Sequence, residues 1–301
     1  MVIIDHLLLR SFIMKKLFSV ISLLVLIAAL VLAGGGKETS QPATQPAPQP
    51  VAQSYTIAVG GSTSVTPLME LFQADYEKAN GNVKITISGT GSGDGIKGAS
   101  EGTYEIGMSS RELTPAEIGS GLEPLVIAID GIAAIVNNNN PAVNLTQTQI
   151  QEIYTGKITR WEQLGAAAGG KTGGIAVISR EPGSGTRSAF QELLNFSDAD
   201  QIKNAIIFDG TGAIKSAVAG NADAIGYISL GSLDTSIKAL KVDGIDATTD
   251  NVKAGQYKIA RPFILITKRG VVLNPAVRAF LDWTLTDAGQ AIVKRSWISI
   301  K

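Results

Sequence analysis

From residue 55 onward, short apolar runs alternate with amphipathic segments along the chain. Residues 56–59, 83–87 and 175–178 are rich in β-branched side chains, the pattern of buried strands. Each run is followed by a turn rich in Gly, Ser or Thr and then by a segment with helical periodicity. Strands that alternate with helices predict an α/β fold with a mostly parallel sheet.

The remaining segments continue this alternation. Further strands are expected over residues 105–108, 125–136, 205–208, 224–228 and 257–267. Helices are expected after Pro67, from Ile96, from Pro115, from Thr146 to Tyr154, and over residues 186–194, 213–219, 275–285 and 288–294. The chain is expected to leave a first lobe near residue 135 and to return to it near 258, so we predict lobe 1 over 55–135 and 258–301 and lobe 2 over 136–257.

Residues 179–190, S-R-E-P-G-S-G-T-R-S-A-F, join a strand to a helix through a glycine-rich turn. The first amides of a helix lack intrahelical partners, and the helix dipole favours negative charge there. Ser184 and Thr186 add hydroxyl donors, and Arg180 adds a guanidinium that can grip an oxyanion. On its own the segment is equally consistent with an ordinary corner bearing a surface arginine. Similar turns at residues 60–65 and 88–95 favour an anion site.

The N-terminal residues predict export. Met14-Lys15-Lys16 precedes the apolar run 17–33, which is typical of a secretory signal. Met14 is a plausible start, and residues 1–36 are then a signal peptide with an upstream extension. The alternative is a transmembrane anchor. Gly35 stands where a lipoprotein signal would need cysteine, so no lipid anchor is expected, and residues 37–54 are too polar and proline-rich to pack. We expect a protein at the periplasmic or extracellular face of the cell membrane.

Composition removes several classes of chemistry. The 301 residues have a formal net charge of zero, which gives no indication of a nucleic-acid partner. There is no cysteine, and the one histidine, His6, lies in the predicted signal region. A Ser-His-Asp triad, a cysteine nucleophile and a histidine metal site are therefore not expected in the mature protein, and neither is a cofactor.

Three patterns in the sequence resemble functional motifs, but their sequence context does not support those functions. Residues 165–172 fit the Walker A pattern, but a helix end precedes them and a strand follows, the reverse of a phosphate-binding loop. Residues 93–98 fit G-x-G-x-x-G, yet no acidic residue ends a second strand at the required distance. Asp94 and Glu112 are more simply a helix-start charge and a solvated carboxylate than a catalytic pair.

As an ordered set, the turn motifs resemble those of the phosphate-binding proteins that serve as substrate-binding subunits of phosphate ABC transporters. The resemblance covers residues 55–301 and rests on segments 61–68, 89–96, 106–111, 145–161, 179–187 and 224–230. It implies a two-lobed type II periplasmic-binding-protein fold with two crossover strands and a ligand cleft between the lobes. It also implies a non-enzymatic monomer that delivers inorganic phosphate to a membrane permease.

Carried over position by position, the resemblance implies ligand contacts from three turns and from the end of a further strand. Many family members have an aspartate where this chain has Ser110, and that carboxylate accepts the proton of hydrogen phosphate. A serine hydroxyl can accept that bond or donate to sulfate, which weakens discrimination. Asp94 could substitute, and Arg111 either contacts the anion or pairs with Asp94 or Glu112. The expected phosphate ligands are Ser62, Thr63, Ser64, Ser92, Ser110, Arg111, Arg180, Ser184, Gly185 and Thr186.

Two other functions stay open at this point. One is a binder of another tetrahedral oxyanion, such as sulfate or molybdate. The other is a secreted phosphoryl-handling hydrolase with a Ser or Asp nucleophile, which the scarcity of histidine and cysteine disfavours.

Overall fold

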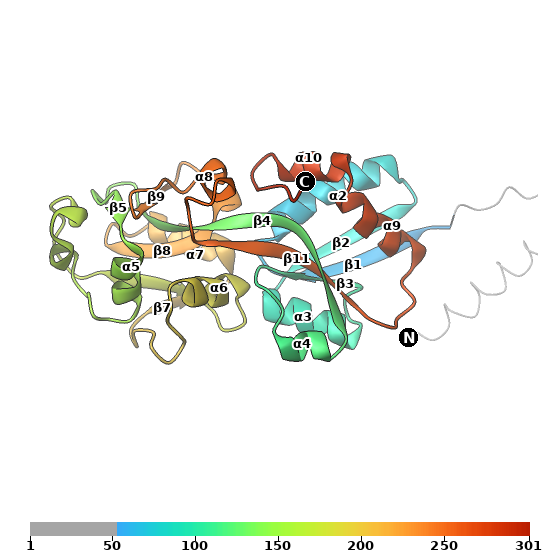
Figure 1. The fold of residues 1–301 in the computed structure, drawn as a ribbon, viewed down its shortest axis with the longest axis horizontal. Helices are drawn as coiled ribbons and strands as arrows, with labels where there is room; N and C mark the ends of the chain where they lie inside the picture. Colours follow the sequence, from blue (N-terminus) through green and yellow to red (C-terminus); the bar gives the residue numbers. More distant parts are fainter. Residues whose placement is uncertain (1–52) are drawn as a thin grey trace, which may run out of the picture. The chain divides into compact units, whose positions relative to one another are not determined.

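The computed structural model describes residues 53–301 (Figure 1). The predicted signal peptide, Gly35 and most of the predicted linker lie outside the described residues. No helix among residues 53–301 combines the length and the apolar character needed to cross a membrane.

The first lobe is built on three parallel strands. β1 (Tyr55–Gly61) lies between β2 (Val83–Gly89) and β3 (Ile106–Ser109). Its helices are α2 (Thr66–Ala79), α3 (Ser92–Glu101), α4 (Pro115–Gly119), α9 (Pro275–Thr284) and α10 (Asp287–Val293). This arrangement places the turns after β1 and β2 at the same edge of the sheet, where ligands bind in open α/β sheets.

The second lobe repeats the plan. β6 (Ala176–Arg180) pairs in parallel with β7 (Ile206–Phe208) and with β8 (Ala224–Ser229). The lobe also contains β5 (Asn144–Leu145), α5 (Gln147–Tyr154), the 3₁₀ helix η1 (Trp161–Ala168), α6 (Gly185–Leu193), α7 (Gly210–Ala219), η2 (Leu230–Ser232), β9 (Ile237–Ala239), β10 (Lys241–Val242) and α8 (Thr249–Lys253).

Two long strands run side by side between the lobes (Figure 1). β4 (Leu122–Asn137) and β11 (Ala260–Lys268) are antiparallel to each other, and they also run antiparallel to β8 and β3, respectively. The sheet order is β2-β1-β3-β11-β4-β8-β6-β7. The pairing is thus parallel within each lobe, and the strands that cross between lobes make the sheet mixed rather than mostly parallel.

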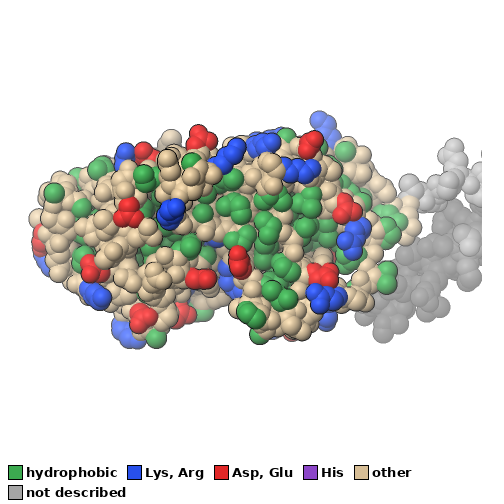
Figure 2. Space-filling view, in the orientation of Figure 1, with side chains coloured by type: hydrophobic (Ala, Val, Ile, Leu, Met, Phe, Trp, Pro, Cys, Tyr) green, Lys and Arg blue, Asp and Glu red, His purple; other side chains and the backbone are tan. Residues whose placement is uncertain are grey.

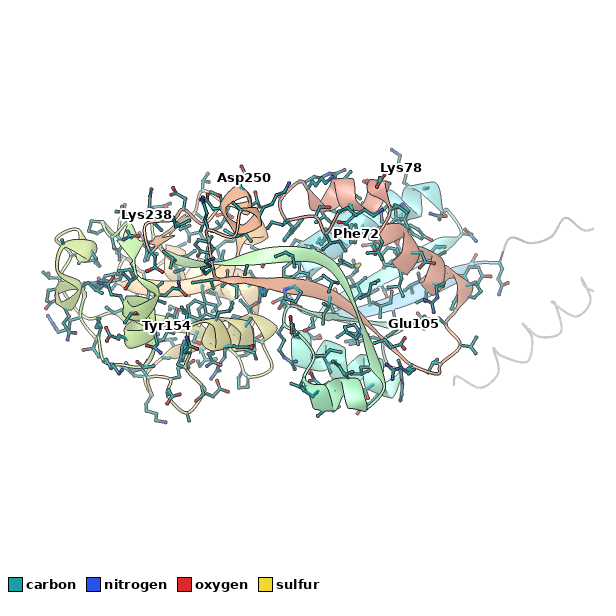
Figure 3. The ribbon with its side chains drawn as sticks, viewed as in Figure 1. Phe72, Lys78, Glu105, Tyr154, Lys238 and Asp250 are labelled. Atoms are coloured by element: carbon teal, nitrogen blue, oxygen red, sulfur yellow. The ribbon has the colours of Figure 1, made fainter. Side chains whose placement is uncertain are left out.

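Each lobe has its own hydrophobic core. Phe72 belongs to the core of the first lobe and Tyr154 to that of the second, well apart in Figure 3. The crossover strands contribute to both cores. The packing passes from the first core to the second between Ala128 and Ile132 of β4, and it passes back between Ala260 and Phe263 of β11. The two-lobed α/β fold expected from the sequence is therefore confirmed.

The motif-like patterns have structural explanations. Residues 161–168 form η1, which is broken at Gly165, and no strand leads directly into it, so the segment is not a phosphate-binding loop. Helix α3 begins at Ser92, four residues before the predicted start, and therefore contains the G-x-G-x-x-G pattern. A β-carbon at Gly95 would lie 2.6 Å from the Met108 carbonyl oxygen, and one at Gly98 would lie 2.3 Å from the Tyr104 ring. These glycines permit close helix–sheet packing.

Positive and negative side chains are interspersed over the face shown in Figure 2, with no large area of one sign. This agrees with the zero net charge of the sequence.

Candidate functional site

The glycine-rich turns of the two lobes meet in one cluster of hydroxyl groups. Ser64 Oγ, after β1, lies 2.8 Å from Thr186 Oγ1, in the first turn of α6. The backbone of Gly185 approaches α3 so closely that a β-carbon there would lie 2.3 Å from Ser92 Oγ. Three turns that are distant in sequence are thus in contact, and they bring donors from both lobes to one place.

Three serines of the first lobe form the floor of this cluster. Ser62 Oγ donates to Ser110 Oγ over 2.9 Å, and Ser92 Oγ lies 3.3 Å from Ser110 Oγ. All three side chains are buried. The Ser62 amide donates to the Met108 carbonyl and is therefore not available to a ligand.

Arg180 lies at the centre of the cluster and is 2% exposed. Its Nε and Nη2 atoms donate to the Glu181 carboxylate over 2.7 and 2.6 Å, and Nη2 also donates to Thr63 Oγ1 over 3.0 Å. Burial alone would raise the pKa of Glu181, but Arg180 and the Gly210 amide outweigh it and lower the pKa. Arg180 is therefore oriented by an ionised partner while it faces the hydroxyl groups.

Helix α6 supplies backbone donors. Ser184 caps it, with Oγ accepting the Arg187 amide over 3.2 Å, so the helix starts at Gly185. The first amides of a helix have no intrahelical acceptor, and the helix dipole favours an anion there. The serine hydroxyl can still donate, because a hydroxyl carries both a proton and lone pairs.

A fourth turn joins the cluster, and the sequence reasoning missed it. Thr211 opens α7, and its Oγ1 lies 3.2 Å from both Thr63 Oγ1 and Ser64 Oγ. Gly210-Thr211-Gly212 follows a strand and begins a helix, as the three recognised turns do. The same pattern could have identified Thr211 beforehand.

The prediction for Arg111 requires a correction. Its Nη1 and Nη2 atoms donate to the two carboxylate oxygens of Glu117, each over 2.8 Å, and Nη1 also donates to the Glu112 carbonyl. The partner is the capping carboxylate in the first turn of α4, rather than Asp94 or the Glu112 side chain. Arg111 makes no hydrogen bond to the hydroxyl cluster, and we remove it from the candidate site.

A carboxylate-lined cavity of about 370 Å³ adjoins the cluster at Thr63. Asp94, Glu181 and Asp209 line it. Asp94 is exposed and has no hydrogen bond to the serine floor among the described residues, whereas Glu181 is bonded to Arg180.

Another buried arginine, also missed from the sequence, lies under the serine floor. Arg261 Nη1 donates to the Ser110 carbonyl over 3.1 Å, and Nη2 lies 3.2 Å from Asp130 Oδ2. Burial raises the pKa of Asp130 to about 6 and lowers that of Arg261 to about 10, and their pairing opposes both shifts. The available signal was a charge in the middle of each of two largely apolar strands, Asp130 in β4 and Arg261 in β11.

The arrangement suits a small tetrahedral oxyanion. It offers several buried hydroxyl groups, the half-buried hydroxyl of Thr63, the amides of a helix start and one edge of the buried Arg180 guanidinium. Residues 53–301 contain no group of three or more His, Cys, Asp or Glu side chains placed to hold a metal ion.

Comparison with known proteins matches the chain to a family. Residues 41–288 match the model of the PBP superfamily domain. A putative phosphate ABC transporter substrate-binding protein from Clostridium perfringens, solved with bound phosphate, is 46% identical with a TM-score of 0.78, covering 82% of this chain and all of that one. An ABC-type phosphate transport receptor from Vibrio cholerae is 32% identical with a TM-score of 0.67, covering 81% of this chain and 99% of that one.

A curated relative agrees with these structures. The phosphate-binding protein PstS of Borreliella burgdorferi is 29% identical over 256 residues, which are 81% of this chain and 90% of the relative. The family resemblance inferred from the turn motifs is confirmed. The chain belongs to the PBP superfamily and, within it, is a PstS-like protein.

Proposed function

We propose that this protein is the substrate-binding subunit of a phosphate ABC importer and captures inorganic phosphate outside the membrane. The observation that carries the proposal is the convergence of four strand–turn–helix units from two lobes on one largely buried set of hydroxyl groups around Arg180. The relatives named for phosphate binding support the same ligand.

Phosphate would be bound mainly by neutral donors. Two buried arginines near the cluster are each paired with a carboxylate, Arg180 with Glu181 and Arg261 with Asp130, so neither supplies an uncompensated positive charge. Hydroxyl and amide dipoles would then balance the charge of the anion in a site closed to water. The proposed ligand residues are Ser62, Thr63, Ser64, Ser92, Ser110, Arg180, Ser184, Gly185, Thr186 and Thr211.

Binding would close the two lobes over the anion. We retain the proposed lobes, residues 55–135 with 258–301 and residues 136–257, joined by hinges near 135 and 258. Direct contacts between hydroxyls of opposite lobes, such as Ser64 with Thr186, support a closing motion that shields the ligand. The loaded form would then dock on a membrane permease, and no catalytic step is proposed.

Selectivity depends on Ser110, whose hydroxyl has no carboxylate as a hydrogen-bond partner among residues 53–301. A carboxylate acceptor would reject sulfate, which brings no proton, whereas a hydroxyl can donate to it. Binding of another tetrahedral oxyanion, such as sulfate, is therefore the second candidate function.

Calorimetric titration of the protein, stripped of bound anion, tests both candidates. Phosphate and sulfate would be titrated between about pH 5 and 8, a range over which phosphate loses its second proton while sulfate carries none. Tight phosphate binding without sulfate heat is expected. Equal binding of both anions would establish a general oxyanion receptor, and binding of neither would contradict the proposed function.

A further inference from the structure

The buried pair of Arg261 and Asp130 lies where the two lobes are joined. The two residues face each other in the register of β11 and β4, the strands that cross between lobes. Their side chains are 2% and 0% exposed. The Arg261 guanidinium also lies 5.4 Å from the centre of the Phe263 ring, which fixes its plane.

The pair contacts both lobes at once. On one side, Arg261 donates to the carbonyl of Ser110, whose hydroxyl belongs to the serine floor. On the other side, Asp130 accepts the hydroxyl of Ser229 over 2.8 Å and the amide of Gly231, at the end of β8 and in η2. A continuous chain of polar contacts thus runs from the anion site through the crossover strands into the second lobe.

Stability alone does not explain the position of this pair. The cost of removing two charges from water is large, and well-packed apolar residues often serve a core equally well. An arginine, however, can donate in two directions with fixed geometry, which an apolar side chain cannot do. Here the two acceptors are the Asp130 carboxylate on the neighbouring strand and the backbone carbonyl of Ser110.

We propose that Arg261 and Asp130 are positioning residues that fix Ser110 relative to the second lobe and favour the closed arrangement of the lobes. The inference rests on the proposed function for its ligand, but it concerns residues outside the four ligand-binding turns. Removal of the pair is expected to loosen closure, so that bound phosphate leaves faster and the ligand-free lobes lie further apart.

The test is a double substitution, Asp130→Asn with Arg261→Met, which removes both charges without leaving one unpaired. Asparagine keeps an acceptor for Ser229 and Gly231. The matched control is Glu123→Gln with Arg269→Met, an exposed ion pair (2.9 Å) at the far end of the same two strands. Phosphate dissociation rates would be measured by stopped flow.

The distance between the lobes in the absence of ligand would be measured by pulsed electron–electron double resonance between two spin labels. The chain has no cysteine, so labels at Lys97→Cys on α3 and Glu192→Cys on α6, both exposed positions, would be unique. We expect dissociation to be about tenfold faster in the double variant, with a shift to longer distances. The control pair should stay within about twofold of the wild-type rate, as expected of an exposed ion pair.

A folded double variant with wild-type dissociation and wild-type distances would overturn the inference. If the double variant does not fold, Arg261→Lys decides, because lysine keeps the charge but cannot reach both acceptors with fixed geometry. Wild-type dissociation and distances in that variant would equally overturn it. If the wild-type protein does not bind phosphate, the proposed function fails. The role of Arg261 and Asp130 in lobe closure is then tested only by the distances between the labels in the ligand-free double variant and wild type.

Discussion

Arg180 and Arg111 look alike in the sequence and differ in the folded protein. Each lies at or just after the end of a parallel strand, next to serine residues, and each forms a two-pronged ion pair with a glutamate. The side chain of Arg180 is 2% exposed and also donates to Thr63 in the opposite lobe. That of Arg111 is 20% exposed, and its partner is a helix-capping carboxylate within its own lobe.

The difference shows that an arginine needs more than a favourable place in sequence to bind an anion. Glu181 accepts from Nε and Nη2 of Arg180, which leaves the outer edge of the guanidinium directed at the hydroxyls of Thr63 and Thr211. The carboxylate of Glu117 occupies both outer nitrogens of Arg111, and the nearby Glu112 carbonyl accepts as well. We therefore expect one arginine to determine affinity and the other to contribute only to stability.

Removal of Arg180 should have the largest effect. Arg180→Ala should raise the phosphate Kd by at least about tenfold, because each charge-assisted hydrogen bond contributes about 1.5–3 kcal/mol. Arg180→Lys should recover only part of this loss, because an ammonium lacks the planar fork. Calorimetry measures both. Near wild-type affinity in Arg180→Ala would contradict the assignment of Arg180 to the site.

Ser184 combines the two roles, because it is a proposed phosphate ligand and it also caps helix α6. Ser184→Ala should raise the phosphate Kd about tenfold through the loss of a buried donor to the anion. It should also lower the free energy of unfolding by about 1 kcal/mol through the loss of the α6 cap.

The control for Ser184 is Thr286→Ala, which removes the cap of α10, where the hydroxyl accepts the Gly289 amide. Urea unfolding should detect a loss of about 1 kcal/mol in this variant as well. Calorimetry should detect no change in affinity. Equal losses of affinity in the two variants would mean that Ser184 acts only through helix stability.

Much of the fold could be predicted because local patterns determine it. Apolar β-branched runs predicted the main strands, and capping residues such as Thr114 and Thr146 predicted helix starts that the structure confirms with full capping boxes. The start of α3 was predicted four residues late, since its first turn is made of Ser, Gly and Asp rather than apolar residues. The antiparallel crossover depends on contacts between strands over 120 residues apart, which no local pattern encodes.

The candidate site was predicted from its turn motifs. The prediction was incomplete where the orientation of a side chain decides its role. Three turns were recognised because glycine, serine and threonine recur after strands. Thr211 has the same signal and was overlooked. The orientation of Arg111 and the pairing of Arg261 with Asp130 depend on which partners the tertiary fold supplies, and sequence spacing does not specify those partners.

The smallest expected effect lies at Arg111. The hydrogen bonds and charge of Arg111 lower the pKa of Glu117 from its ordinary value of 4.5 to about 2. A carboxyl whose pKa is lower in the folded state stabilises the fold above its unfolded pKa, and this contribution is lost as the pH falls through the folded value. Because the pair is partly exposed, Glu117→Gln should lower the free energy of unfolding by only about 1 kcal/mol near neutral pH.

The pH dependence tests this assignment directly. The difference in unfolding free energy between Glu117→Gln and wild type should shrink steadily below the ordinary pKa of 4.5 and vanish near the folded value of about 2. Arg111→Ala should show a similar loss of stability near neutral pH while its phosphate Kd stays within about twofold of wild type. A tenfold loss of affinity in Arg111→Ala would return Arg111 to the site and remove the contrast with Arg180, because an arginine with both outer nitrogens on a carboxylate would then still reach the anion.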